Sequence, residues 1–114
     1  SLKKMVMIMG ENPMKDDPTS VAIGSRLFLK NCVQCHGKDG RGGGELAKSL
    51  PTSPANLPQL AQRKSAKTFA ANIYYGKNAM PAYKNQFSEE QIWHLANFVK
   101  SMERGTNQLR SRKP

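Results

Sequence analysis

The 114 residues of this chain fit one small domain. A hydrophobic share of 38% is low for a self-sufficient core, and a buried cofactor would supply the missing apolar surface. The 18 Lys and Arg against 8 Asp and Glu give a formal net charge of +10, which favours partners with acidic docking surfaces. We expect no nucleic-acid partner, because the basic residues are scattered, aromatics make up 7%, and no nucleic-acid-binding motif is present.

Residues 1–18 are predicted to form an N-terminal extension, because Pro13 and Pro18 break any long helix. Its apolar run, residues 5–9, is too short for a signal peptide or a membrane span. A series of methionines there could bind soft copper ions, but no histidine or cysteine reinforces such a site. We therefore favour an apolar strap packed on the domain, or a disordered end, for Met5, Met7, Met9 and Met14.

A helix is predicted from Thr19 or Ser20, either of which can act as its N-cap, to about Asn31. Gly24 falls on its apolar side, together with Phe28. A glycine inside a helix costs about 1 kcal/mol relative to alanine. We infer that another backbone approaches closely at Gly24.

The motif Cys32-Val33-Gln34-Cys35-His36 follows this helix. Two thiols three positions apart can form thioethers to the vinyl groups of a haem, and the adjacent imidazole can bind its iron. Cys32 and Cys35 are thus candidate haem anchors, and His36 is the candidate proximal ligand. A thioredoxin-like dithiol would require a βαβ pattern that is not found, and a zinc site usually requires four ligands, whereas the chain holds two Cys and two His.

The segment after the motif, residues 37–44, is so rich in glycine that we expect a loop that lets the chain wrap beside a flat cofactor. A short helical piece is predicted over residues 45–50. Pro51, Pro54 and Pro58 then predict an extended, irregular passage.

Ser65 is predicted to cap a helix of about ten residues that stops at Gly76, and a loop over residues 77–83 follows. Ser88 and Gln91 form a capping box for the last helix. The apolar stripe of that helix consists of Ile92, Leu95, Ala96 and Val99. His94 points away from this stripe, which predicts a surface residue and a poor iron ligand.

Met80 is the candidate second iron ligand. Of six methionines, it alone lies in a loop beyond the haem motif, since four precede the motif and Met102 belongs to the last helix. A thioether is neutral and soft, and it stabilises reduced iron relative to a histidine or thiolate ligand.

Taken together, the helix with Gly24, the motif ending in His36, Met80-Pro81 and the terminal helix resemble a class I cytochrome c of the bacterial monohaem type, over about residues 19–103. The resemblance implies a small all-α fold wrapped around one covalently bound haem c. It also implies that Gly24 and Phe28 cross Leu95 and Phe98. In this family a proline carbonyl commonly orients the proximal histidine, which leaves Pro51 and Pro54 as candidates here. Asn78 or Tyr83 could hydrogen-bond the methionine side or a propionate, although ordinary loop packing is favoured for both.

The resulting hypothesis is a soluble, monomeric electron carrier that makes and breaks no substrate bond. It would be periplasmic or otherwise exported, with a signal peptide that is not in the sequence. Residues 104–114 are predicted to be a solvated basic tail, which carries Arg104, Arg110, Arg112 and Lys113. The alternatives are a haem-based sensor or peroxidase-like enzyme with an open sixth position, and an electron-transfer subunit of a larger redox complex.

Overall fold

The computed structural model describes the backbone of residues 10–111 and the side chains of residues 10–104. Its helical elements are α2 (Pro18–Asn31), α3 (Val33–His36), the 3-10 helix η1 (Glu45–Ser49), α4 (Leu57–Ala61), α5 (Ala66–Tyr75) and α6 (Glu89–Ser111). No strand occurs among the described residues beyond one isolated bridge, between Lys77 and Met80. The predicted all-α fold is confirmed.

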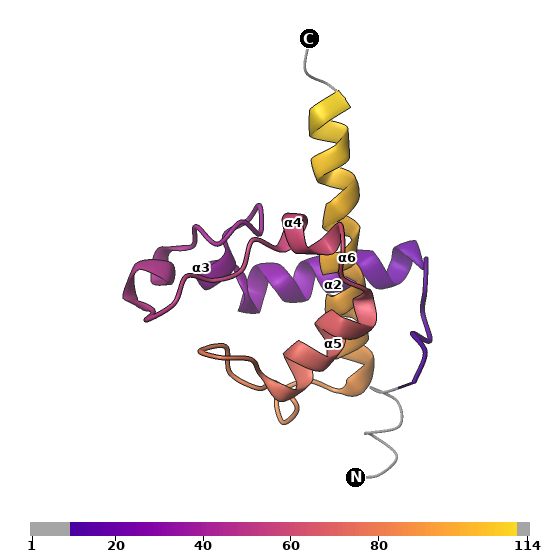
Figure 1. Cartoon of the computed structure of the whole chain (residues 1–114). Coiled ribbons are helices and arrows are strands. Elements are labelled where there is room, and N and C mark those ends of the chain that lie inside the picture. Colours follow the sequence, from indigo (N-terminus) through magenta and orange to yellow (C-terminus); the bar gives the residue numbers. More distant parts are fainter. Residues whose placement is uncertain (1–9, 112–114) are drawn as a thin grey trace.

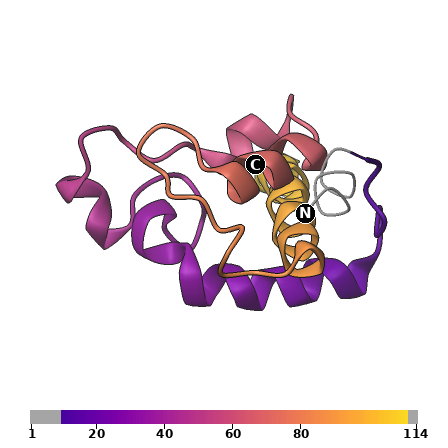
Figure 2. The same cartoon turned by 90° about the horizontal axis from the view of Figure 1, so that it is seen from below.

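Helix α6 is the axis of the fold, because α2, α4 and α5 all pack against it (Figure 1). In Figure 2, α2 passes on one side of α6, while α4 and α5 lie on the other. The α2–α6 crossing is close at Gly24, where an added Cβ would lie 1.9 Å from the His94 carbonyl oxygen. Beside it the rings of Phe28 and Phe98 lie 5.2 Å apart. The predicted close approach at Gly24 and the predicted crossing are both confirmed.

His94 was predicted to lie on the surface, and this prediction is wrong: the residue is only 6% exposed. Its Nδ1 lies 2.7 Å from the Ser20 hydroxyl, which also accepts a hydrogen bond from Asn97. Helix α2 therefore covers a flank of α6 that is less apolar than its central stripe. A buried polar network replaces apolar contacts on that flank.

Two N-terminal helix boundaries differ from the predictions. The N-cap of α2 is Asp17, whose carboxylate accepts from the Thr19 amide, so the helix starts before Thr19 or Ser20. The passage predicted to be extended through Pro58 instead contains α4, with Asn56 as its N-cap. Proline fits the first turn of a helix, where its missing N–H would have no partner anyway.

The other predicted helix ends agree with the structure. Ser65 caps α5 through the Thr68 amide, and Gly76 ends that helix with φ 80°. Ser88 and Gln91 form both bonds of the capping box of α6. Helix α6 has a helical backbone through Ser111, so the helix continues into the segment that was predicted to be a solvated basic tail. Arg112 and Lys113 lie outside the described residues.

The described part of the N-terminal extension, residues 10–17, lies along the α2–α6 pair. Met14 packs against the core, and its carbonyl accepts a hydrogen bond from Asn97. Asn12 donates a second bond to the Asn97 side chain. The strap interpretation is confirmed for Met14, whereas Met5, Met7 and Met9 lie outside the described residues. None of the helices in the described part of the chain has the length and apolar character needed to cross a membrane.

Candidate functional site

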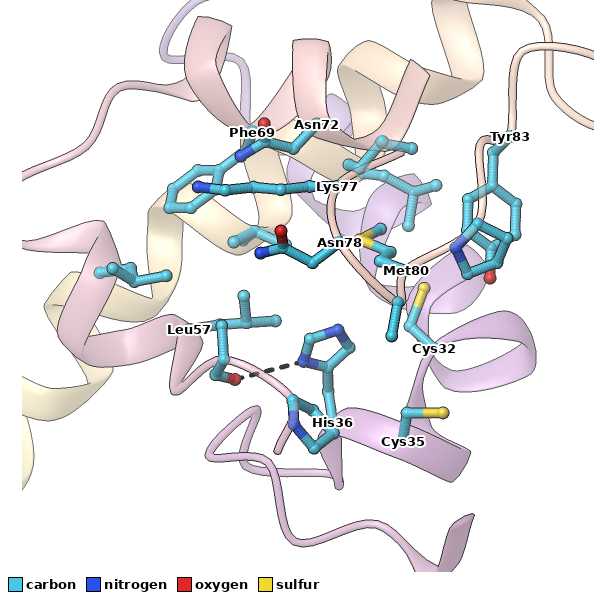
Figure 3. A pocket seen from close by; sticks show the side chains of 18 of the residues that line it. Cys32, Cys35, His36, Leu57, Phe69, Asn72, Lys77, Asn78, Met80 and Tyr83 are labelled. Atoms are coloured by element: carbon cyan, nitrogen blue, oxygen red, sulfur yellow. Dashed lines mark hydrogen bonds between the residues drawn. The ribbon is translucent and has the colours of Figure 1, made fainter. Parts of the chain in front are cut away.

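A cavity of about 390 Å³ opens between the end of α2, the segment from residue 50 to α4, helix α5 and the loop after it (Figure 3). Its wall is largely apolar, with side chains from α2, α4, α5 and α6 that include Phe28, Leu57, Leu60, Phe69, Ile73 and Leu95. Several of these residues also belong to the buried core. The cavity is thus shaped by the same packing that holds the helices together.

The predicted anchor residues Cys32, Cys35 and His36 all line this cavity. Cys32 ends α2 and begins α3, and its carbonyl accepts from the His36 amide at 3.0 Å. The glycine-rich loop then folds back on this turn. A Cβ added to Gly44 would lie 2.2 Å from the Gln34 carbonyl oxygen, so only glycine permits this approach.

The His36 imidazole is held by a backbone carbonyl, with 3.3 Å between its Nδ1 and the Ala55 oxygen. Pro51 and Pro54 were the candidates for this role, and both predictions are wrong, since the acceptor is the next residue after Pro54. Donation from Nδ1–H leaves the lone pair on Nε2, the nitrogen available to a metal. Burial lowers the pKa of His36, against a smaller opposing effect of the Ala55 bond, and so favours the neutral ligand form.

The Cys32 thiol does not have the electrostatics of the attacking thiol of a redox dithiol. Burial, with a further contribution from Cys35, raises the pKa of Cys32 to about 11. Thiols of the thioredoxin class have a lowered pKa, because the thiolate is the attacking species. Across the described residues, no three His, Cys, Asp or Glu side chains form a group that could hold a metal ion.

Met80 lies across the cavity from His36 (Figure 3). Its loop is fixed at several points: Lys77 and Met80 exchange backbone hydrogen bonds of 3.1 and 2.9 Å, and the Tyr83 amide donates to the Ile73 carbonyl at 2.9 Å. The Tyr83 ring stacks on Phe87, with 5.4 Å between centroids. Asn78 and Tyr83 both line the cavity. Their suggested hydrogen bonds to the methionine side or a propionate stay predictions.

Residues 19–99 match the family model described as cytochrome c oxidase, cbb3-type, subunit III. The chain belongs to the class I c-type cytochromes. Over 76 residues it is 37% identical to cytochrome c6 of Aphanizomenon flos-aquae, which covers 67% of this chain and 83% of that protein. Cytochrome c6 of Nostoc sp. is 36% identical, over 67% of this chain and 65% of that protein.

Two solved structures share the fold of this cytochrome. A chain of the Kuenenia stuttgartiensis reducing HAO-like protein complex superposes with a TM-score of 0.69 at 23% identity, covering 79% of this chain. This cytochrome spans 46% of that chain. The KustC0563 c-type cytochrome gives a TM-score of 0.59 at 23% identity, over 69% of this chain and 95% of its own.

Family membership identifies one covalently bound haem c, with its iron, as the cofactor and electron transport as the activity of this cytochrome. The cavity fits such a group. It combines an apolar wall, two cysteines that form no disulfide, and an imidazole whose Nδ1 is already bonded. Thioether chemistry requires free thiols, and a flat apolar macrocycle requires an apolar slot.

Two features of the site were not predicted from the sequence. The Ala55 carbonyl carries no side-chain signal, so only the fold could identify it. Lys77 also lines the cavity, and its place three residues before Met80 was a signal that could have been used.

Proposed function

We propose that this cytochrome is a one-electron carrier in which Cys32 and Cys35 anchor the haem through thioethers, while His36 and Met80 ligate its iron from opposite sides. The observation that supports this most directly is that all four side chains, from α2, α3 and a distant loop, face one apolar cavity. The bound haem would supply the change between ferrous and ferric iron. No substrate bond would be made or broken.

The chain's own contribution is to hold both ligands still. The Ala55 carbonyl fixes the His36 ring, and the paired Lys77–Met80 backbone bonds fix the methionine loop. Ligands that stay in place between oxidation states keep the rearrangement that accompanies electron loss small. The apolar wall would place the bound haem in surroundings of low dielectric constant.

Met80→Leu is the variant that tests the ligand pair, because leucine keeps the side-chain volume and removes the sulfur. The oxidised parent should have a methionine-to-iron charge-transfer band, and the variant should lack it. Met102→Leu is the matched control, since Met102 is partly buried in the core yet does not line the cavity. A band that persists in Met80→Leu would rule out Met80 as the ligand.

We propose that redox partners with acidic surfaces receive or donate the electron, and that the protein works as a monomer in an exported compartment. The net charge of +10 supports electrostatic steering toward such partners. The rate of electron transfer to an acidic partner should therefore fall as ionic strength rises, because salt screens long-range attraction. A rate that does not change with salt would contradict acidic docking.

A second candidate is a subunit of a larger redox assembly. The matching family model, which is described as an oxidase subunit, favours this alternative. Sedimentation of the purified holoprotein with solubilised membranes separates the two. Free monomer supports the shuttle, and co-sedimentation with an oxidase supports the subunit.

A further inference from the structure

Lys77 is the one lining residue of the cavity, within the described part of the chain, whose side chain carries a permanent charge. Its ammonium has no ion pair or hydrogen bond with any described residue. In Figure 3 the Lys77 and Asn78 side chains extend from the loop into the cavity, away from Cys32 and Cys35. The Lys77 side chain is exposed, so its ammonium is solvated here. An anionic group that enters the cavity would find this ammonium as the charged lining group among the described residues.

The turn that carries Lys77 is built to hold this orientation. Lys77 and Met80 close it at both ends with reciprocal backbone bonds. Asn78 between them has φ 53°, in the left-handed region that asparagine adopts more readily than most residues. Such a conformation is kept where the surrounding structure requires it, and it often marks a functional site. The Asn78 side chain is exposed and extends into the cavity on the same side as Lys77 (Figure 3).

Haem c supplies the anion. Its two propionates lie on the edge of the macrocycle away from the two former vinyl groups, so a haem anchored at Cys32 and Cys35 presents its carboxylates to the far part of the cavity. We propose that Lys77, assisted by the Asn78 amide, binds a haem propionate. A charge-assisted hydrogen bond between an ammonium and a carboxylate is stronger than a neutral one.

This contact would also position Met80. The same four-residue turn carries the cation and the proposed sulfur ligand, so a bound propionate would hold both ends of that turn on one macrocycle. Lys77 is therefore a positioning residue. The proposal rests on haem attachment at Cys32 and Cys35, as given under Proposed function, but not on the identity of the sixth ligand.

The test compares Lys77→Gln, Lys77→Arg and Lys84→Gln in the holoprotein. Lys84 is exposed on the same loop and does not line the cavity, so its variant removes an equal charge without touching the site. A nearby cation favours the ferrous state, which carries one positive charge fewer than the ferric state. At a fixed potential, Lys77→Gln should lower the ferrous-to-ferric ratio by about threefold, the scale for losing one charge at a partly solvated site. The logarithm of the ferrous-to-ferric ratio should change less than half as much in Lys84→Gln as in Lys77→Gln. Lys77→Arg should retain the parent ratio.

A second readout reports on the propionate itself. In proton NMR of the oxidised protein, the propionate methylene resonances should shift in Lys77→Gln and stay in place in Lys84→Gln. Equal effects of Lys77→Gln and Lys84→Gln in both measurements would overturn the proposal. That failure is distinct from failure of the proposed function, which would appear as a parent that carries no covalent haem by mass spectrometry or lacks the methionine band.

Discussion

Gly24→Ala should destabilise the holoprotein strongly, because the backbone of α6 leaves no room for a side chain at position 24 of α2. The added Cβ would lie 1.9 Å from the His94 carbonyl oxygen and 2.8 Å from the Phe98 Cβ. Ordinary contact begins at 3.4 Å, so the helices would have to separate locally by about 3.4 − 1.9 = 1.5 Å. The opposing atoms are backbone or Cβ atoms, which cannot turn aside as the end of a flexible side chain can.

The size of the expected decrease in the free energy of unfolding follows from two opposing effects. Overpacking typically costs 1–3 kcal/mol, and this contact belongs at the upper end, whereas alanine improves helix propensity by about 1 kcal/mol. We expect a net decrease of about 2 kcal/mol in the free energy of unfolding, or about 10 °C in the melting temperature. Separation at the crossing would also loosen Phe28 against Phe98, two residues whose rings pack at the crossing.

Denaturant unfolding of the holoprotein, followed by far-UV circular dichroism, measures this effect. Gly43→Ala is the matched control, because a Cβ there would meet nothing within 4 Å. The control should unfold at the same denaturant concentration as the parent or slightly above it. If Gly24→Ala were as stable as Gly43→Ala, the close crossing deduced from position 24 would be refuted.

Two further substitutions test how the helices flanking the cavity are held. The Ser88 hydroxyl accepts a hydrogen bond from the Gln91 amide at 3.1 Å, and Ser88→Ala removes this half of the capping box. The variant should lower the free energy of unfolding in urea by about 1 kcal/mol, while Ser88→Asp should retain most of the stability. Lys100→Met removes the ammonium that donates to the carbonyls of Ala61 at 2.7 Å and Lys64 at 3.0 Å, so amides of α4 should exchange with solvent faster than in the parent. Unchanged stability in the first case, or unchanged exchange in the second, would contradict these roles.

The sequence was most informative where the chemistry is local. Cys32, Cys35 and His36 lie within one turn of chain, so their spacing alone predicted that they would face one cofactor. Capping at Ser65 and Ser88 is likewise a matter of three or four neighbouring residues, and both helix starts were predicted correctly. Met80 was predicted as a ligand by exclusion of the other methionines, and the fold brings it to the cavity that Cys32, Cys35 and His36 line.

The predictions were wrong where distant segments decide the outcome. His94 is buried because α2 crosses its flank of α6, and no periodicity within α6 reports that neighbour. Helix α4 is five residues long, too short to form from propensity alone, and Lys100 supports its end from across the fold. The Ala55 carbonyl was missed because a backbone acceptor can be supplied by any residue type.

Exposure of the reduced protein to carbon monoxide tests the central claim most directly, because that ligand binds only to an iron with an open position. If Met80 closes the sixth position, the spectrum of the ferrous parent should stay unchanged, while that of Met80→Ala should shift on carbon monoxide binding. A shift of equal size and rate in the parent would contradict the closed electron-transfer site and favour a sensor or a peroxidase-like enzyme.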